Sequence, residues 1–251
     1  MISKRIIPSL IIKEGELIHR KNFDSNSDRY VGDPLNAINI FNEYFTDEIV
    51  ILDIEASKKN YINFSLLKDL AGEAFTPLSY GGGISTIEQA EKIIKMGYEK
   101  LILNNICFSD FNFIKKIKRS LGAQSIVISI DIIKSENKYF LYDYKTKGKR
   151  EYSVNDFLQR IRELEIGEIL ITSVLNDGMM DGCDLELINK FENFIDVPII
   201  YRGGLSSLND MKLVFKTTVS AITSSTFFIM KKKDGGIVLN YPSKDEKKII
   251  C

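Results

Sequence analysis

The chain has 251 residues, of which 44% are apolar, and its 34 basic residues balance its 34 acidic ones. Such a chain can bury a large core, and a net charge near zero gives no reason to expect nucleic acid or a membrane surface as its partner. Its three cysteines are odd in number and widely spaced, which argues against a disulfide framework or a zinc site and fits a reducing cytoplasm.

Eight short apolar runs, rich in β-branched residues, alternate with helical stretches along the chain. Their length and composition suit strands that are buried on both faces, as in a parallel sheet. The runs cover residues 5–12, 48–54, 76–80, 100–105, 125–132, 168–173, 197–201 and 219–224. Between them, the stretches 86–96 and 154–164 repeat apolar residues at intervals of three and four, with Ser85 and Ser153 as the expected N-caps.

Eight strand–helix units in a chain of this length predict one (β/α)8 barrel domain, the TIM-barrel fold of the α/β class. The alternative is a doubly wound sheet, which favours a Gly-rich turn after its first strand. Here the first strand is followed by IKEGELIH, which holds a single glycine. We expect the domain to span residues 1–251, with the stretch after Met230 as a short, solvent-exposed C-terminal tail.

The two halves of the chain repeat one pattern. IIPSLII at 6–12 aligns with IVISIDI at 126–132, and DEIVILDIEAS at 47–57 aligns with GEILITSVLND at 167–177, each 120 residues later. YGGGI at 80–84 and YEKLILNN at 98–105 align with YRGGL at 201–205 and VSAITSST at 219–226. The repeat predicts a duplicated half-barrel, with halves of about 1–120 and 121–230. At one aligned position the second half has Asp131 and the first has Ile11.

Two Gly-rich turns fall at the C-terminal ends of expected strands, where barrel enzymes place their sites. Gly81-Gly82-Gly83 follows the third strand, and Gly203-Gly204 follows the seventh. Glycine lets backbone N–H groups approach phosphate oxygens, so the pair predicts two phosphate sites across the mouth of the barrel. Tight turns without a ligand are the alternative. Other polar residues expected at this rim are Asp53, Asn104, Asn105, Asp131 and Asp177.

Four charged residues of alternating sign fall at strand starts, at the opposite end of the barrel: Arg5, Glu48, Lys100 and Glu168. Around the bottom of a barrel they can close into a ring of salt bridges. From spacing alone the favoured interpretation is a stabilising ring or ordinary surface pairing, because TIM barrels usually keep stabilising residues at this face.

These segments, with GDP at 32–34 and PIIYRGG at 198–204, resemble the cyclase subunit of imidazole glycerol phosphate synthase, a glutamine amidotransferase of histidine biosynthesis. The similarity runs from KRIIPSL at 4–10 to about Phe228. It implies a glutaminase partner at the bottom face, a gate for ammonia at the four charged residues, a phosphorylated substrate at the top, and no cofactor or metal. The residues implied to bind phosphate are Gly82, Gly83, Asn104, Asp177, Gly178, Gly203, Gly204, Ser224 and Ser225.

The resemblance also implies two catalytic aspartates, a base that falls on Asp131 and an acid that falls on Ile11. Isoleucine cannot carry a proton, and loss of an acid or base typically costs about 10²- to 10⁴-fold in rate. His19 stands at a lysine position of the family and is expected in a loop. Tyr201-Arg202 stands where the family has small residues, so its bulk is expected to crowd the second phosphate side.

An intact gate beside a damaged cyclase site is similar to a paralogous branch found in surface-polysaccharide loci, in which ammonia is supplied to a separate sugar amidotransferase. YVGDPLNAINIFNE at 30–43 and PLSYGGGIS at 77–85 resemble that branch. The leading hypothesis is therefore a cytoplasmic, ammonia-channelling subunit. Two alternatives stay open: a working cyclase in which Glu14 or Asp177 replaces the acid, and a regulatory or scaffolding barrel without ammonia flux.

Overall fold

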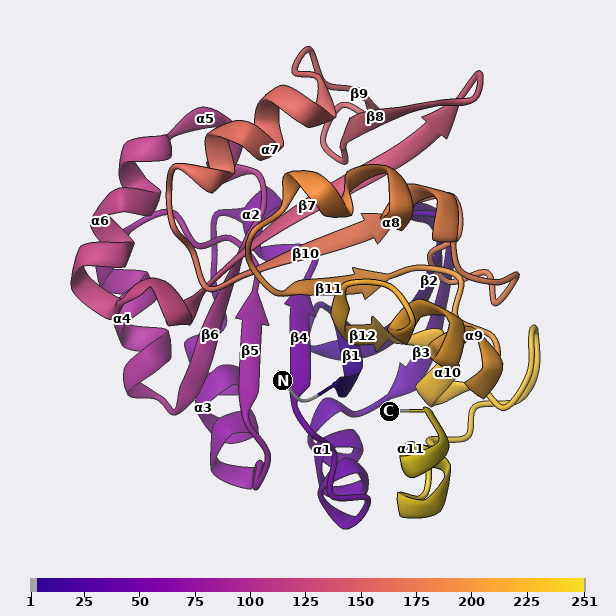
Figure 1. Ribbon diagram of the computed structural model, residues 1–251. Coiled ribbons are helices and arrows are strands. Elements are labelled where there is room, and N and C mark those ends of the chain that lie inside the picture. The colour runs from indigo at the N-terminus through magenta and orange to yellow at the C-terminus, as the bar shows by residue number, and fades with distance from the viewer. Residues whose placement is uncertain (1–3, 251) are drawn as a thin grey trace.

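The computed structural model describes residues 4–250, and eight parallel strands in it close into a barrel (Figure 1). The ring of pairings is completed between β7 and β10 and between β12 and β1. The barrel strands are β1 (Arg5–Lys13), β4 (Ile49–Asp53), β5 (Leu78–Gly81), β6 (Tyr98–Leu103), β7 (Ile126–Ser135), β10 (Glu168–Ser173), β11 (Ile199–Arg202) and β12 (Val219–Ser224). The predicted (β/α)8 barrel is confirmed, because a doubly wound sheet would leave two open edges.

Helices surround the barrel and connect its strands (Figure 1). The longer ones are α1 (Pro34–Glu43), α3 (Phe64–Glu73), α4 (Ile87–Lys95), α6 (Phe111–Leu121), α7 (Val154–Arg162), α8 (Leu185–Phe191), α9 (Leu208–Phe215) and α11 (Lys244–Ile250). Short helical turns are α2 (Ala56–Lys59), α5 (Ile106–Ser109), α10 (Thr226–Ile229), η1 (Ala123–Ser125) and η2 (Glu192–Phe194). In the described part of the chain, none of these helices has both the length and the apolar composition of a membrane span.

One of the two predicted N-caps is correct. Ser153 accepts a hydrogen bond from the backbone N–H of Asp156 at 3.1 Å and begins α7. The prediction of Ser85 for α4 is wrong by one residue, because Thr86 accepts the N–H of Gln89 at 3.2 Å. The Gln89 side chain accepts the N–H of Thr86 in return, at 3.1 Å, and this reciprocal pair fixes the helix start.

Alternate residues of each strand face two different cores. Inside the barrel, one layer is formed by Ile7, Val50, Ile102, Val127, Leu170, Ile200 and Ala221. Between the barrel and the helices, a larger core includes Ile6, Ile51 and Leu103 from the strands and Phe157 and Phe215 from the helices. The strands are therefore buried on both faces, as their continuous apolar runs predict.

Two hairpins extend the first strand of each half beyond the barrel, and the sequence patterns above predict neither. β1 continues into β2 (Glu16–Lys21) and β3 (Asp24–Gly32), and β7 continues into β8 (Lys138–Asp143) and β9 (Gly148–Lys149). The first turn of each is two residues long, Glu14-Gly15 and Glu136-Asn137, with positive φ throughout. Such turns match the twist of a hairpin. The prediction of a loop at His19 is wrong, because this residue lies in β2 and is only 2% exposed.

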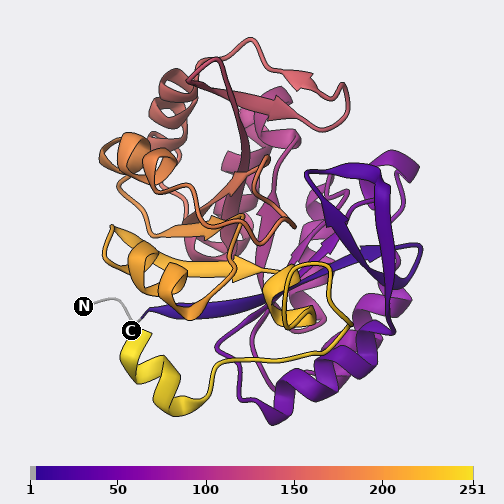
Figure 2. The ribbon, with the colours of Figure 1, turned by 90° about the vertical axis from the view of Figure 1, so that its right-hand side faces the viewer.

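The stretch after Met230 is exposed at most of its positions, but it folds back to the bottom of the barrel and buries a few residues there. Met230 forms an antiparallel β-bridge with Ile237. The last element of the described residues is α11, which is the eighth of the longer helices around the barrel. Tyr241 is buried, and its hydroxyl donates to the carbonyl of Ile6 at 2.7 Å. In Figure 2, α11 lies beside the start of β1, and the two hairpins lie at the other end of the strands.

Candidate functional site

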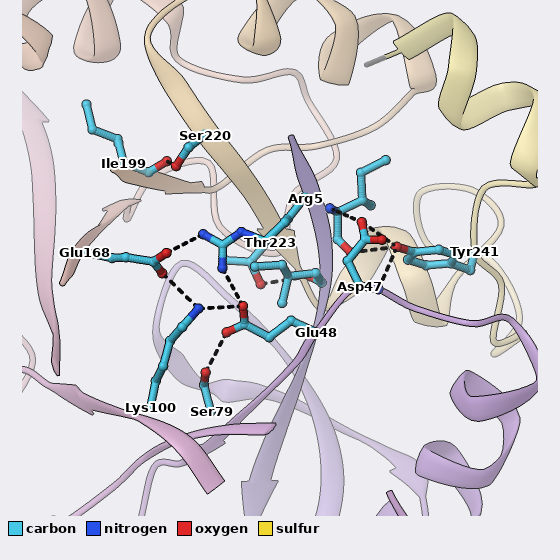
Figure 3. A network of polar contacts seen from close by, with 12 residues as sticks. Arg5, Asp47, Glu48, Ser79, Lys100, Glu168, Ile199, Ser220, Thr223 and Tyr241 are labelled. Carbon is cyan, nitrogen blue, oxygen red and sulfur yellow. Dashed lines mark hydrogen bonds and ion pairs between the residues drawn. The ribbon is translucent and has the colours of Figure 1, made fainter. Parts of the chain in front are cut away.

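A ring of four charged side chains closes the barrel where its strands start (Figure 3). Arg5 donates to Glu48 and to Glu168 at 2.6 Å each, and Lys100 bonds the same two carboxylates at 2.9 and 3.2 Å. Ser79 also donates to Glu48, at 2.5 Å, and the Glu48 side chain is only 4% exposed. The structure therefore brings all four predicted residues together in one continuous ring of ion pairs. Ordinary surface pairing, in which each pair stands alone, does not describe this arrangement.

The polar contacts at this end extend to the C-terminal segment. Asp47, next to the ring residue Glu48, accepts the backbone N–H of Ile6 at 2.9 Å and pairs with Lys247 at 2.5 Å. The Tyr241 hydroxyl lies 3.3 Å from the same carboxylate (Figure 3). On the other side of the ring, along the barrel axis, lies the apolar layer that includes Ile7. Charged groups thus close this end of the barrel, and hydrocarbon follows directly behind them.

A cavity of about 810 Å³ opens at the other end of the strands. Eight residues predicted at this rim line it, together with Ile11: Asp53, Gly81, Gly82, Gly83, Asn104, Asn105, Asp131 and Asp177. The other five predicted phosphate-binding residues do not line it: Gly178, Gly203, Gly204, Ser224 and Ser225. The sequence repeat predicts two similar halves of the mouth, but in the structure the half with the first Gly-rich turn is open and the half with the second is closed.

Asp131 lies in the floor of this cavity, at the point where β7 leaves the barrel and continues into the second hairpin. Its carboxylate accepts a hydrogen bond from the Asn104 side-chain amide at 2.9 Å. Burial raises the pKa of Asp131 to about 6, although the Asn104 bond and the Arg202 charge oppose this rise. A carboxyl group with a pKa near neutrality can exchange a proton with a bound ligand, which is the chemistry expected of this position.

Neither of the side chains that could replace the missing acid is free to do so. Glu14 does not line the cavity, and it pairs with Lys59 at 2.9 Å, which lowers the pKa of its carboxyl group. Asp177 does line the cavity, but both of its oxygens accept hydrogen bonds from Arg202, at 3.0 and 3.1 Å. Ile11 itself is 4% exposed and offers only hydrocarbon.

The first Gly-rich turn lies on the open side. Gly83 has φ 64°, in the left-handed region, and a Cβ at Gly82 would lie 2.7 Å from the carbonyl oxygen of Asp53. Both positions therefore require glycine for the turn to pack against the segment after β4. Asp53 accepts the N–H groups of Glu55 and Ala56, each at 3.0 Å, and so shapes this neighbouring segment.

The second Gly-rich turn is filled from inside the protein. Arg202 is 3% exposed, and besides its two bonds to Asp177 it donates to the Ser9 hydroxyl at 3.2 Å. The side chain that fills the space at the second Gly-rich turn is therefore Arg202. Tyr201 does not contribute to it, because it packs in the outer core and its hydroxyl accepts the N–H of Asp184 at 2.8 Å.

Backbone contacts seal the same side. The N–H of Gly182 donates to the carbonyl of Gly204 at 2.9 Å, and a Cβ at Gly204 would lie 1.9 Å from the Gly182 oxygen. A Cβ at Gly178 would lie 2.2 Å from the carbonyl oxygen of Arg20 in β2, so the first hairpin covers this loop. His19 contacts the Gly178 carbonyl at 3.2 Å, and burial lowers the pKa of its imidazole. These glycines permit close packing of the backbone.

The two hairpins touch each other above the barrel. The rings of Phe23 and Tyr142, one from each hairpin, meet edge-on with their centroids 6.0 Å apart. The hydroxyls of Ser225 and Thr226 are buried and have no hydrogen-bond partner within residues 4–250. The same residues contain no group of three His, Cys, Asp or Glu side chains that could hold a metal ion.

Comparison with known proteins places the chain among relatives of similar length. A sequence model described as histidine biosynthesis protein matches residues 5–233. A Leptospira interrogans protein, provisionally named imidazole glycerol phosphate synthase subunit HisF, is 36% identical over 254 residues, which cover 100% of this chain and 99% of the relative. A Vibrio vulnificus protein, provisionally named subunit hisF3, is 36% identical over 252 residues, 99% and 96% of the two chains. A Petrotoga mobilis protein, named subunit HisF, is 33% identical over 231 residues, 91% of each chain.

Proposed function

The chain belongs to the histidine biosynthesis family, and on that premise we propose that it is the barrel subunit of a glutamine amidotransferase. A glutaminase subunit docks at the face where the strands start and releases ammonia there. The barrel passes this ammonia along its axis towards the mouth. The nitrogen then serves a separate amidating enzyme that modifies a sugar in surface-glycan biosynthesis.

The observation that carries this proposal is the ring of Arg5, Glu48, Lys100 and Glu168 in front of an apolar barrel interior. Neutral ammonia can cross a layer of hydrocarbon, whereas the ammonium ion would lose its hydration without compensation. A ring of alternating charges in front of that layer excludes bulk water while its ion pairs are closed. Such a ring is more than a barrel needs for its stability, since hydrophobic packing could replace it.

Exposed aromatic side chains beside the ring support docking of a partner at this face. Phe45 lies between α1 and β4, Phe75 lies between α3 and β5, and they are 74% and 89% exposed. Both loops lead into strand starts, so they lie at the same end as the ring. Asn42 joins them, because its side chain bonds the Glu73 carbonyl at 2.8 Å and the Phe75 N–H at 3.0 Å. Aromatic residues that are exposed together often anchor protein partners.

The state of the mouth argues that the acceptor of the nitrogen belongs to another enzyme. Ile11 lines the cavity opposite Asp131, and the two other acidic candidates are held by Lys59 and Arg202. A cyclase reaction with a general acid and a general base therefore lacks one of its two groups. The ring at one end of the barrel is complete, whereas the site at the other end lacks a proton-transfer group. This combination is consistent with a conduit that delivers ammonia to another enzyme.

The second candidate is the cyclase reaction of histidine biosynthesis itself, with ammonia and a ribulosyl nucleotide as substrates. Asp131 favours it, because its carboxyl group remains in the floor of an open cavity with a pKa of about 6. Growth of a histidine auxotroph that lacks its own cyclase separates the two candidates. Restoration of growth by this chain at ordinary expression would support the cyclase and contradict the conduit for a glycan enzyme.

The conduit is tested with Lys100→Met in the complex of this chain with its glutaminase and the amidating enzyme. We expect glutamine-dependent amidation to fall at least about tenfold per glutamine hydrolysed, because an opened ring lets ammonia escape. Amidation with added ammonium salt should stay unchanged. Lys134→Met is the control, since Lys134 pairs with Glu186 on the outer surface at 2.5 Å. Equal coupling in both variants would contradict the proposed channel.

A further inference from the structure

We propose that ammonia leaves the barrel only on the side of the first Gly-rich turn, and that the amidating enzyme docks over this side with an acidic surface that matches the second hairpin. The inference rests on the proposed function and deepens it, because it assigns the exit and the chemistry of the partner. Two differences between the halves of the barrel carry it. One side of the mouth is open and the other is filled, and the second hairpin is basic whereas the first is balanced in charge.

The cavity at the mouth reaches down to the apolar interior of the barrel. Ile102 and Leu170 belong to the apolar layer behind the charged ring, and both also line the cavity. On the second side the Arg202 guanidinium bonds Asp177 at 3.0 and 3.1 Å and reaches the Ser9 hydroxyl in β1 at 3.2 Å. Nitrogen that crosses the apolar layer therefore enters the cavity directly and leaves it past the first Gly-rich turn.

The second hairpin lies over this open side. Its strands β8 and β9 project from the barrel (Figure 1), and the loop between them contacts the rim. In this loop the Tyr144 hydroxyl lies 2.8 Å from the hydroxyl of Ser57 in α2. Lys145 and Lys147 of the same loop line the cavity. A protein that covers the exit must therefore contact this hairpin.

The two hairpins differ in charge. Residues 13–32 of the first hairpin contain four lysines and arginines and four acidic side chains, whereas residues 133–150 of the second contain six and two. Within residues 4–250, two of these six basic side chains form ion pairs. The other four are exposed and have no carboxylate partner there: Lys138, Lys145, Lys147 and Lys149. Positive charges without a partner on one side of the mouth attract an acidic surface.

An exposed aromatic side chain stands at the same rim. Tyr61 is 63% exposed and follows Asn60, which lines the cavity at the end of α2. Tyrosine is a frequent anchor in protein interfaces, because its ring is apolar while its hydroxyl stays hydrated. The rim thus combines an anchor for a pocket with a positive surround, which suits an acidic protein surface.

The chemistry of ammonia requires that the partner seal the rim. Ammonia released into water near neutral pH takes up a proton and ceases to be a nucleophile. The enzyme that consumes the nitrogen must therefore cover the exit while the nitrogen passes. Opposite charges speed the association of such a pair, and a buried aromatic anchor slows its dissociation.

The test is surface plasmon resonance of the full chain on the immobilised amidating enzyme. The double variant Lys145→Glu, Lys147→Glu should bind at least about tenfold more weakly, mainly through slower association. Lys115→Glu, Lys116→Glu is the matched control, because it makes the same change of charge at exposed positions of α6 that do not line the cavity. This control should bind as the unchanged chain does, and equal affinities of the two double variants would overturn the docking surface.

A second pair of variants tests the side of the mouth. Tyr61→Ser should weaken binding at least about tenfold, mainly through faster dissociation. Tyr30→Ser is the control, since Tyr30 is 62% exposed but lies on β3 of the first hairpin. An equal loss in both variants would show that the partner is not confined to the open side, and the proposal would fail.

The docking surface and the conduit fail in different ways. Lys100→Met tests the conduit through the coupling of amidation to glutamine hydrolysis, and Lys100 lies at the other end of the barrel. Intact coupling in the unchanged chain, with equal binding of the two double variants, would overturn the docking surface alone. If the unchanged chain does not bind the amidating enzyme at all, the docking surface and the conduit fall together.

Discussion

Ile11 and Asp131 occupy equivalent places in the two halves of the barrel. Ile11 in β1 pairs with Leu52 in β4, and Asp131 in β7 pairs with Thr172 in β10, with each partner 120 positions apart in the sequence. Both side chains line the same cavity. The mouth thus presents a carboxyl group from one half and hydrocarbon from the other, and only one of the two can transfer a proton.

The first prediction concerns cyclase activity in the absence of any glutaminase. With free ammonium salt and the ribulosyl nucleotide substrate, we expect turnover about 10²- to 10⁴-fold below that of a related cyclase, because one proton-transfer group is missing. The Petrotoga mobilis relative, at 33% identity, is a suitable reference. The variant Ile11→Asp should not recover full activity, since Arg202 still fills the second side of the mouth. Turnover of the unchanged chain near that of the reference would refute this prediction.

The second prediction concerns the docking surface for the glutaminase. Phe75→Asp places a charge on the exposed aromatic pair beside the ring, and we expect the affinity for the glutaminase to fall at least about tenfold. Tyr30→Asp is the matched control, because Tyr30 is 62% exposed but lies on β3, at the opposite end of the barrel. Surface plasmon resonance with the glutaminase immobilised measures both. If the two variants bind equally well, the glutaminase does not dock on this surface.

The third prediction concerns the stability of the ring. Arg5→Met removes the cation that bridges Glu48 and Glu168, both at 2.6 Å, and leaves Lys100 as the only cation paired with these two largely buried carboxylates. We expect the free energy of unfolding to fall by about 3 kcal/mol, as when one partner of a buried ion pair is removed. Lys134→Met breaks a pair on the exposed surface and should cost less than about 1 kcal/mol. Urea denaturation of both variants decides the matter, and similar losses would mean that the ring behaves as ordinary surface pairing.

The sequence predicts the ring better than it predicts the mouth, for a physical reason. Arg5 and Glu168 are the first residues of strands, and a closed parallel barrel brings its strand starts together whatever the loops do. The mouth is built from loops, whose course depends on their tertiary contacts. Gly203 and Gly204 predict a phosphate site in the sequence, and only the structure shows that Gly203 packs closely against Ser173 and Gly204 against Gly182.

Local sequence patterns do not predict the two hairpins or α11 either, because tertiary contacts determine these elements too. Glu14-Gly15 and Glu136-Asn137 are weaker turn signals than Asn-Gly or Asp-Gly, and the strands that they join look like loops because they are short and partly polar. α11 is only seven residues long and rich in lysine, so its few apolar residues give no clear periodicity. Its place is fixed by Tyr241, whose hydroxyl bonds a carbonyl 235 residues earlier in the chain.

The last prediction concerns the pH dependence of stability that arises from Asp131. Burial raises the pKa of its carboxyl group from 3.8 to about 6 in the folded protein. Between about pH 4 and pH 6 the unfolded chain therefore releases this proton first, and the folded state loses stability as the pH rises. Above about pH 6 both states are ionised and the loss is complete, at about 3 kcal/mol.

Asp131→Asn removes this ionisation, and its amide can still accept a hydrogen bond from Asn104 through its oxygen. We therefore expect the variant to gain stability relative to the unchanged chain as the pH rises from about 4 to 6, by up to about 3 kcal/mol, with no further gain above. Urea denaturation at a series of pH values measures the difference. Asp69→Asn, at an exposed position of α3, is the control for removing a carboxyl group from the surface. A difference for Asp131→Asn that does not change with pH would mean that the Asp131 carboxyl group titrates as it does in the unfolded chain.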